Sequence, residues 1–426
     1  MERYSEYKDS GVKWLGKIPS HWDMRKMKFT FEERREKGFP NLPLLAATQN
    51  HGVIRKQDYE NRTVEATKAL ETLKLVEKGD FVISLRSFQG GIELSHERGI
   101  ISPAYTVLRP SHISSAYFKH LGKSPVFIQL LKSMVTGIRE GQNIDYGKLR
   151  ENLIPIPSLG EQNAIAKYLD SVTAKIDEAI AQQQKMIDLL NERKQIIINK
   201  AVTKGLDPNV KMKPSGIDWI GEIPEHWEVK KLKYVFSRIA DGTHFSPQTT
   251  EDGYPYITAS DVDGVGINYQ NAKKISSKDY ENLVMSGCKA FKGDVLLVKD
   301  GATTGRVGLK TDDVDCVTLS SVAMLSPNER LSELFMMYLL KSFVLQEQIL
   351  ESMSGAAMPR ITLVKLANFF AIIPPEKEQK QIAAYIEKMI LPIDDIIDRT
   401  QKQISLLQER KQIIINDVVT GKVKVV

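Results

Sequence analysis

The sequence predicts an α+β protein built by internal duplication: two globular α/β domains, each followed by a long helix. Three observations predict this fold class. A tryptophan-containing segment that begins at Ser10 returns at Ser215, and a second segment that begins at Leu189 returns at Leu406. Between these markers, short apolar runs typical of strands alternate with helical patterns. Two stretches without glycine then carry apolar residues at heptad spacing.

The repeated segments match closely. Residues 10–22 read SGVKWLGKIPSHW and residues 215–227 read SGIDWIGEIPEHW, and these two copies contain all four tryptophans of the chain. The second marker reads LLNERKQIIIN and then LLQERKQIIIN. The second marker returns at a longer spacing than the first, so the second repeat carries its extra length between the markers. The two repeats thus share their flanking segments and differ in the sequence between them. This pattern indicates one architecture that recognises two different targets.

Length and composition place the chain among ordinary globular proteins. Its 426 residues are enough for two or three domains, and its content of 42% hydrophobic and 26% charged residues is typical of such proteins. We expect no membrane span and no signal peptide, because no long uncharged apolar run is present. Two isolated cysteines, Cys288 and Cys316, form no disulfide framework or metal cluster. These features favour a cytoplasmic location.

The net charge of +6 is unevenly distributed. Residues 1–160 contain 25 Lys and Arg against 18 Asp and Glu, a balance of +7, whereas residues 205–375 contain 18 against 21, a balance of −3. A basic first half suits a polyanion such as DNA, because neutralising phosphates dominates such affinities. If the second half binds DNA, it must use a local basic patch.

The two long helices are expected at 161–199 and 376–416. At about 1.5 Å per residue the first would be about 55–60 Å long. Polar residues recur at matched positions, Gln183 with Thr400 and Arg193 with Arg410, and can fix the register of paired helices. Pro392 is expected to kink or break the second helix. The residues that we expect to pair the helices are Ile165, Leu169, Val172, Ile176, Leu190, Ile197, Ile382, Ile386, Ile393, Leu407 and Ile414.

The mixed segments contain matched strands. Residues 80–85 and 294–298 are strand-like, and each follows a Lys-Gly-Asp turn; residues 105–108 and 321–325 are strand-like and each precedes a proline. Residues 116–134 and 332–353 carry the pattern of amphipathic helices.

Sequence motifs for catalysis are absent. The glycine-rich stretch 301–308 lacks the Lys-Ser/Thr ending of a phosphate-binding loop, so an exposed tight loop is the better interpretation. None of the seven histidines has metal-ligand spacing. His21 and His226, next to repeated tryptophans, are expected to fix a turn against the core. The run around Asp294 and Lys299 offers only weak support for a nuclease core. The sequence therefore predicts a recognition protein with no catalytic residues and no metal site.

Base recognition requires polar and basic side chains on loops held by a rigid scaffold. The loops that follow the two Lys-Gly-Asp strands meet this requirement and differ in content, as expected if each recognises its own bases. Further candidates lie at 241–244 and in the segments 141–143 and 357–360 that precede the long helices. The residues that we expect to contact DNA are Arg86, Ser87, Gln89, Asn143, His244, Lys299, Thr303, Thr304, Arg306 and Arg360.

Over essentially its whole length the chain resembles the specificity (S) subunit of bacterial type I restriction–modification systems. The resemblance rests on four features, each present twice: the WLGxIPxHWxxxxLK-like opening (14–28 and 219–233), the Lys-Gly-Asp strands, the proline-rich entry with Glu-Gln (161–162 and 378–379), and the LLxERKQxIIN ending. Each feature alone is weak evidence, whereas the ordered set occurring twice is specific.

The resemblance implies two target recognition domains that each recognise half of a split, asymmetric site on double-stranded DNA. It places them at 1–160 and 205–375, separated by two conserved helices (161–204 and 376–426) packed antiparallel with pseudo-twofold symmetry, as in a coiled coil. It also implies a non-catalytic subunit without a cofactor of its own. Methyltransferase (modification) subunits would hold S-adenosylmethionine, and a restriction subunit would use ATP and Mg²⁺. The acidic second domain departs from a uniformly basic DNA-binding surface.

Two other classes of function remain open at this point. The chain would be a stand-alone DNA nuclease or methyltransferase with duplicated DNA-binding arms if an assay of the pure chain detected either activity. It would be a coiled-coil scaffold that binds only protein if a salt-dependent titration detected no DNA binding.

Overall fold

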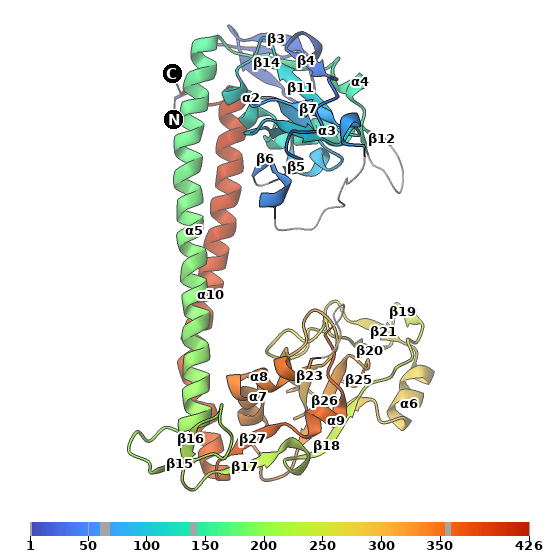
Figure 1. Ribbon diagram of the computed structural model, residues 1–426, viewed down its shortest axis with the longest axis vertical. Helices are drawn as coiled ribbons and strands as arrows, with labels where there is room; N and C mark the ends of the chain where they lie inside the picture. The colour runs from blue at the N-terminus through green and yellow to red at the C-terminus, as the bar shows by residue number, and fades with distance from the viewer. Residues whose placement is uncertain (1, 50, 60–68, 137–142, 354–358, 426) are drawn as a thin grey trace. The chain divides into compact units, whose positions relative to one another are not determined.

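The structure is a computed structural model that describes residues 2–49, 51–59, 69–136, 143–353 and 359–425 (Figure 1). The chain divides into two compact units: unit 1 comprises Met1–Gln184 and Gln401–Val426, and unit 2 comprises Lys185–Thr400. Each long helix therefore contributes its first part to one unit and its last part to the other. The two units are described separately.

The centre of unit 1 is an antiparallel four-stranded sheet of order β4-β11-β8-β9. Its strands are β4 (Phe31–Arg34), β11 (Thr106–Pro110), β8 (Phe81–Ile83) and β9 (Glu93–Leu94). The two runs predicted as strands in this unit are thus the neighbours β8 and β11. The core joins this sheet to the helices α2 (Ser115–Leu121) and α3 (Pro125–Ser133) through phenylalanine rings with centroids 4.5–6.1 Å apart.

Smaller paired strands and short helices surround this sheet. They are β1 (Tyr7–Asp9) with β2 (Lys17–Pro19), β3 (Asp23–Lys26) with β14 (Leu153–Ile156), β5 (Leu45–Thr48) with β6 (Gly52–Arg55), β7 (Lys74–Val76) with β10 (Gly99–Ile101), β12 (Val135–Thr136) with β13 (Asn143–Ile144), and the helices α1 (Ser87–Gly90) and α4 (Tyr146–Leu149).

Unit 2 repeats the central sheet in the order β18-β26-β23-β24. Its strands are β18 (Phe236–Asp241), β26 (Val322–Pro327), β23 (Val295–Val298) and β24 (Val307–Leu309), so the runs predicted as strands here are again neighbours. A five-stranded sheet is added: β19 (Thr249–Thr250), β21 (Lys273–Ile275), β20 (Tyr254–Ile257), β25 (Cys316–Thr318) and β22 (Lys289–Ala290). The other elements are β15 (Met212–Pro214) with β16 (Glu222–Pro224), β17 (Glu228–Lys231) with β27 (Phe370–Ile373), α6 (Ser277–Met285) and α9 (Leu363–Ala367). The predicted α+β duplication is confirmed.

Each of the two predicted amphipathic helices is in fact a pair of helices, so the prediction of single helices was wrong. In unit 1 the break falls between α2 and α3, where the Ser124 hydroxyl accepts a hydrogen bond from the Phe127 N–H and Pro125 occupies the first turn of α3. In unit 2, Ser342 is extended between α7 (Glu333–Lys341) and α8 (Phe343–Ser352). A serine cap and a first-turn proline begin helices, which explains the break in unit 1. In unit 2 the Ser342 hydroxyl instead donates to the Leu339 carbonyl at the end of α7.

The long helices are α5 (Leu159–Lys204) and α10 (Glu376–Val419). With 46 and 44 residues they are about 69 and 66 Å long. Pro392 was predicted to kink or break the second helix, and a break was wrong, because α10 continues through it. Pro392 is exposed, so the carbonyl that loses its intrahelical donor faces water and can be hydrated.

The two long helices bury the same positions. Besides Gln162 and its counterpart Gln379, nine further buried positions of α5 have buried counterparts in α10, in the same repeat frame that relates Leu189 to Leu406. They are Ile165, Ala166, Leu169, Thr173, Ile176, Ile187, Ile198, Ala201 and Val202 of α5, which correspond in order to Ile382, Ala383, Ile386, Ile390, Ile393, Ile404, Ile415, Val418 and Val419 of α10.

The predicted pairing residues lie on or beside this buried line. Of the residues expected to pair the helices, Ile165, Leu169, Ile176, Ile382, Ile386 and Ile393 are buried, and Val172, Leu190, Ile197, Leu407 and Ile414 are half-buried. Because an α-helix turns every 3.6 residues, the buried line drifts away from a strict heptad, and Ile198 and Ile415 are more buried than their predicted neighbours.

Helix pairing is antiparallel in each unit. In unit 1, Ile165 and Leu169 near the start of α5 share a core with Ile415 and Val418 near the end of α10. In unit 2, Ile198 and Val202 at the end of α5 share a core with Ile382 and Ile386 at the start of α10. The ends of the two helices thus meet in opposite order, as the resemblance implies.

One ion pair that joins the two helices in unit 1 has an equivalent in unit 2. In unit 1 the Lys411 ammonium lies 2.7 Å from the Asp177 carboxylate, and in unit 2 Lys194 pairs with Asp394. In the repeat frame of the two helices, Asp394 is the counterpart of Asp177 and Lys411 is the counterpart of Lys194. The same aspartate–lysine contact is therefore made twice, with the roles of the helices exchanged.

The repeated tryptophan segments hold the starts of the long helices. The buried indole of Trp22 donates to Glu161 of α5 at 3.2 Å, with His21 Nε2 2.9 Å from the same carboxylate. Trp227 and His226 contact Glu378 of α10 in the same way, each at 2.7 Å. Each His-Trp pair thus ties its turn to the start of a long helix, and it is the tryptophan that lies in the core, whereas the histidine is exposed.

Candidate nucleic-acid interface

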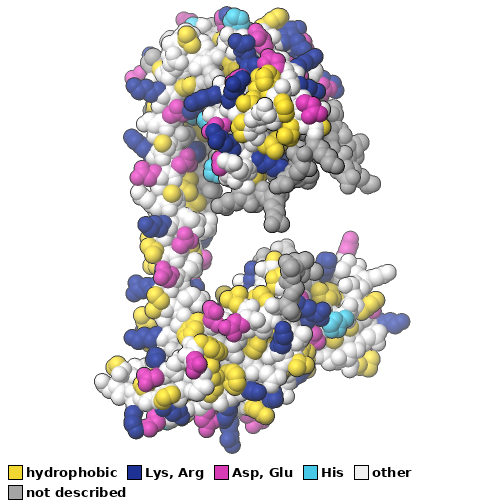
Figure 2. All heavy atoms as spheres, viewed as in Figure 1, with side chains coloured by type: hydrophobic (Ala, Val, Ile, Leu, Met, Phe, Trp, Pro, Cys, Tyr) yellow, Lys and Arg dark blue, Asp and Glu magenta, His cyan; other side chains and the backbone are white. Residues whose placement is uncertain are grey.

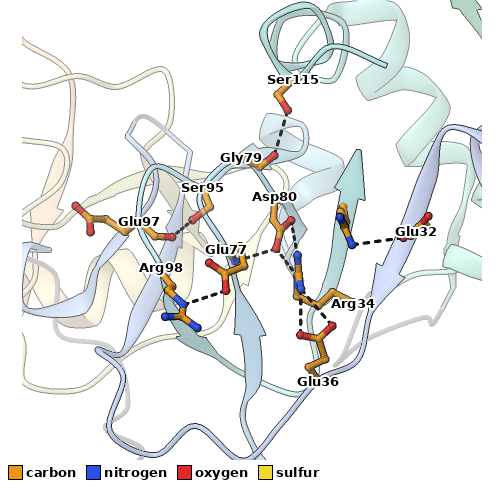
Figure 3. A network of polar contacts seen from close by, with 11 residues as sticks. Glu32, Arg34, Glu36, Glu77, Gly79, Asp80, Ser95, Glu97, Arg98 and Ser115 are labelled. Atoms are coloured by element: carbon orange, nitrogen blue, oxygen red, sulfur yellow. Dashed lines mark hydrogen bonds and ion pairs between the residues drawn. The ribbon is translucent and has the colours of Figure 1, made fainter. Parts of the chain in front are cut away.

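A buried aspartate fixes the turn that precedes the first candidate loop (Figure 3). Gly79, with φ of +94°, makes the turn, and the Asp80 carboxylate accepts hydrogen bonds from the Glu77 N–H at 2.8 Å and from Arg34 Nε at 2.7 Å. Arg34 also pairs with Glu36, and the Ser115 hydroxyl donates to the Gly79 carbonyl at 3.3 Å. The Lys-Gly-Asp signature is therefore a rigid support for β8 and not a catalytic group.

The second Lys-Gly-Asp turn is built in the same way. Gly293 has φ of +89°, and Asp294 accepts from the Phe291 N–H at 2.8 Å and from the Ser326 hydroxyl. Arg238 of β18, a strand of the same sheet, lies 3.7 Å from the same carboxylate. Both candidate loops thus emerge from a strand whose start is held by a buried carboxylate.

The loop after β8 presents two of its three predicted DNA-binding residues. Arg86 and Gln89 are both exposed. Ser87 is 2% exposed, and its hydroxyl accepts a hydrogen bond from the Ser84 N–H at 2.9 Å. Ser87 therefore shapes the loop from below, and Arg86 and Gln89 are the side chains available to a ligand.

Three residues that the sequence did not single out lie against this loop. Gly90 at the end of α1 packs so closely on Gln49 that a Cβ atom at position 90 would lie 2.8 Å from the Gln49 side chain. The helix α1 therefore packs directly on the residue that follows β5. Lys123 donates to the Gln49 carbonyl at 2.8 Å and lies 2.7 Å from the carboxylate of Glu93 on β9. Gln49 and Lys123 lie in segments distant from this loop in the chain, so no local pattern could identify them.

Glu93 is an unusually placed carboxylate. Its side chain is 3% exposed, and apart from the ion pair with Lys123 its oxygens have no hydrogen-bond partner among the described residues. Burial raises the pKa of Glu93 to about 7, against the opposing effect of the Lys123 ammonium. The charge on Glu93, and with it the attraction between Glu93 and Lys123, therefore changes with pH near neutrality.

Asn143 occupies a different place from the other candidates of unit 1. It is exposed on β13, which pairs with β12 at the opposite register position, Thr136. Its predicted neighbours Gly141 and Gln142 lie outside the described residues.

In unit 2 the loop after β23 begins with a buried lysine. The side chain of Lys299 is 2% exposed, and its ammonium lies 2.8 Å from Asp300 and 3.3 Å from Asp241 of β18. Desolvating an ammonium is tolerated only when it is paired, as it is here. Lys299 therefore anchors the loop and is not presented at the surface.

A second segment, from Pro359 to Ile361, pairs with this loop. The Gly301 N–H donates to the Pro359 carbonyl at 3.0 Å, and the Ile361 N–H donates to the Lys299 carbonyl at 2.9 Å. Arg360 Nε lies 3.3 Å from the Asp300 carboxylate, with the Arg360 side chain 58% exposed. The structure thus brings together the candidate segments that start at Lys299 and at Pro359, which are distant from each other in the chain.

The remaining candidates of unit 2 lie around the same loop. Thr304 donates to the Gly301 carbonyl at 2.7 Å, and Arg306 donates to the Val262 carbonyl at 3.2 Å, so both brace the loop, while Thr303 is half-buried. His244 is 68% exposed and 3.7 Å from Asp241, and the adjacent Phe245 is 70% exposed. Phe245 was missed from the sequence because an apolar ring there is indistinguishable from a core residue. The predicted Ala357 and Met358 lie outside the described residues.

Charged side chains of both signs lie on the surface of both units. On the face drawn in Figure 2, Lys and Arg side chains occur over both units and are mixed with Asp and Glu.

Among the described residues, no group of three or more His, Cys, Asp or Glu side chains is arranged to hold a metal ion. Within the same residues, no helix has the length and apolar character needed to cross a membrane.

The comparison with known families decides which proteins this chain belongs with. The family described as the type I restriction modification DNA specificity domain matches twice, over residues 19–187 and 224–406, and these ranges cover most of the chain. The chain belongs to this family. The two matches contain one candidate loop each, together with the first part of the long helix that follows it.

Individual members of the family are similar over long stretches. A type I restriction enzyme MjaVIII specificity subunit of Methanocaldococcus jannaschii is 29% identical over 311 residues, covering 70% of this chain and 69% of the relative. A putative MjaX specificity subunit of the same organism is 27% identical over 455 aligned positions, covering 98% of each chain. A solved structure that concerns complex assembly and conformational transition of the type I R-M system aligns with a TM-score of 0.68 at 17% identity, over 95% of this chain and 99% of that chain, which shows a shared fold.

Proposed function

We propose that this specificity-family chain recognises a bipartite, asymmetric site on double-stranded DNA, with unit 1 contacting one half-site and unit 2 the other. The observation that carries this proposal is the position of the two candidate loops. Each loop follows the equivalent strand of its unit's central sheet, β8 or β23, and each strand starts at a buried aspartate. Yet the first loop presents Arg86 and Gln89, and the second is flanked by His244 and Arg360. A constant frame with different exposed donors suits two different base sequences.

The exposed groups have the chemistry that DNA recognition needs. Arginine donates two hydrogen bonds to guanine, and glutamine bonds adenine in the major groove, each such pair discriminating by about 1–3 kcal/mol. The balance of +7 over residues 1–160 would attract the phosphate backbone to unit 1. In unit 2, with its acidic balance, the exposed Arg360, His244 and Phe245 form the local patch through which DNA binding would occur.

The proposal assigns recognition to this chain and chemistry to its partners. The relatives are named specificity subunits of type I restriction enzymes. We infer that this chain also seats methyltransferase subunits and, through them, a restriction subunit, and that the complex assembles in the cytoplasm. The buried aspartates and the histidine–glutamate pairs support the backbone, so they supply no reactive group for a stand-alone nuclease or methyltransferase.

The test is to map methylated sites in cells that express this chain with type I methyltransferase subunits. We expect a bipartite motif with two different half-sites, and no methylation when this chain is omitted. The purified chain alone should bind duplex DNA in a salt-dependent manner without cleaving or methylating it. Turnover by the isolated pure chain, or an identical motif from partners without this chain, would contradict the proposal.

A further inference from the structure

The start of α5 in unit 1 has a tyrosine ring beside it that the start of α10 in unit 2 lacks. The Tyr4 ring lies 5.4 Å from the His21 ring and 6.0 Å from the Trp22 ring, measured between centroids. Its hydroxyl donates to Glu161 at 3.3 Å. The corresponding position of the second repeat, in the frame that relates Ser10 to Ser215, is Asn209, which is exposed. Among the residues that the structure describes, a tyrosine of this chain therefore completes the site of unit 1 and not that of unit 2.

Unit 2 has a pocket at the place equivalent to the Tyr4 site. The pocket has a volume of about 200 Å³ and is lined by His226, Trp227 and Glu378, the counterparts of His21, Trp22 and Glu161. Leu206, Val210 and Gln381 are further lining residues. A cavity of about 150 Å³ is enough to bind benzene, so this pocket has room for a phenol ring.

The carboxylate in the pocket has fewer donors than its counterpart. Glu161 receives hydrogen bonds from Tyr4, His21, Trp22 and Ser158, and its side chain is 14% exposed. Glu378 receives them from His226 and Trp227 among the described residues, and its side chain is 35% exposed. An ionised carboxylate can accept about four hydrogen bonds. In unit 1 the tyrosine, histidine and tryptophan share one oxygen of Glu161, whereas in unit 2 the histidine and the tryptophan each bond a different oxygen of Glu378. Glu378 therefore retains acceptor capacity for a further donor.

We propose that the pocket of unit 2 binds the phenol ring of a tyrosine side chain presented by a second polypeptide, with its hydroxyl donating to Glu378. The duplicated site of unit 1 identifies the occupant, since there the same histidine, tryptophan and glutamate hold a tyrosine. The ring would fill the space between Trp227 and the linker residues Leu206 and Val210. This inference concerns protein binding at the start of α10 and does not depend on DNA recognition.

The probe is N-acetyltyrosinamide, titrated into the full chain and followed by calorimetry or ligand-observed NMR. We expect one binding site per chain. N-acetylphenylalaninamide, which lacks the hydroxyl, should bind about tenfold or more weakly, because a hydrogen bond to a charged acceptor is lost. Equal affinity for the two probes, or no binding of the tyrosine probe at its solubility limit, would overturn the proposal. Binding of para-cresol without binding of N-acetyltyrosinamide would overturn the polypeptide source.

Two substitutions on the exposed surface of α10 locate the site. Gln381→Trp should fill the mouth of the pocket with the indole ring. The affinity for N-acetyltyrosinamide should then fall by about tenfold or more, because the indole occupies the space that the probe would contact. Lys388→Trp, on an exposed position of α10 outside the pocket lining, is the matched control and should leave the affinity unchanged. Equal effects of the two substitutions would overturn the assignment.

Opening the equivalent site in unit 1 provides a second, independent measurement. Tyr4→Ala should vacate the space beside Trp22 and raise the number of bound N-acetyltyrosinamide molecules from one to two. Tyr4→Phe keeps the ring in place and should leave the number at one. A circular-dichroism melt of each variant verifies folding, and a folded Tyr4→Ala chain that still binds a single probe molecule would contradict the equivalence of the sites.

Discussion

Single side chains divide into those that support the candidate loops and those that the loops present. Ser87 and Lys299 were predicted to contact DNA, but both are 2% exposed and bonded within the protein. Arg86 and Arg360 were predicted on the same grounds and are exposed. Residue type alone could not distinguish the buried residues from the exposed ones, because a lysine is as suitable for a buried ion pair as for a phosphate contact. The burial that distinguishes them arises from strands distant in the chain.

Replacement of Arg86 by Ala should relax base choice at one position of a single half-site. An arginine–guanine pair discriminates by about 1–3 kcal/mol, so binding to the preferred base should weaken roughly 5- to 150-fold while other bases change little. Competition binding with duplexes varied at each position measures this. Arg25→Ala, at an exposed arginine on β3, is the control and should not alter base choice. Uniform weakening across all duplexes would make Arg86 a phosphate contact.

The buried Glu93 should make stability depend on pH near neutrality. Its pKa is raised to about 7 in the folded chain, so between the unfolded value of about 4.5 and about 7 the folded state holds the extra proton. The free energy of unfolding should therefore fall by about 2–3 kcal/mol as pH rises through this window to about pH 8. Urea unfolding at several pH values measures the fall.

Glu93→Gln is the informative variant, because the amide keeps the shape and cannot ionise. Its free energy of unfolding should change less between pH 5 and pH 8 than that of the unsubstituted chain. Glu97→Gln, at a carboxylate that is 40% exposed, serves as the control and should preserve the original slope. An unchanged slope in Glu93→Gln would show that another group titrates in this range.

At the scale of elements, the sequence was most informative where a pattern was repeated. The two long helices, the paired strands after each Lys-Gly-Asp turn and the role of the His-Trp pairs were all predictable from matched motifs. The five-stranded sheet of unit 2 was not, because its strands are short and β20 pairs with β25, a strand far along the chain. The helix breaks at Ser124 and Ser342 were missed because continuous apolar periodicity runs through both.

Replacement of Pro392 by Lys, the residue at the matched position 175 of α5, should stabilise the chain. The substitution restores an N–H donor to the Lys388 carbonyl at an exposed position, and removal of an interior proline is worth about 1–3 kcal/mol. The midpoint of urea unfolding measures the gain. Lys175→Pro, the reverse change in α5, should destabilise by a similar amount, and a stabilising effect of that change would contradict the argument.

At the scale of the whole molecule, the chain is one architecture used twice with different exposed residues. The extra strands of unit 2 and the acidic balance of residues 205–375 show how far the two recognition segments have diverged. The helices and their anchors have kept matched residues, so the frame that carries each loop is common to both. Specificity for each half-site is therefore expected to be separable.

Exchange of residues 205–375 for the same segment of another family member should change one half of the methylated motif and leave the other half unaltered. The reason is that the candidate loop of unit 2 lies entirely within this segment, whereas Arg86 and Gln89 lie outside it. Methylation mapping with the partner subunits measures the motif. A change in both halves would show that the two units do not recognise DNA independently.

The equivalent ion pairs Asp177–Lys411 and Lys194–Asp394 have a genetic consequence. In two copies of a half-length chain ending after α5, Asp177 of one copy would face Lys194 of the other, twice, so the helix interface is self-complementary. Recombination between the two repeated markers in the gene would delete one repeat and still leave a chain able to form this interface as a homodimer. Such a homodimer would carry two identical loops, and its recognition sequence would become a palindrome.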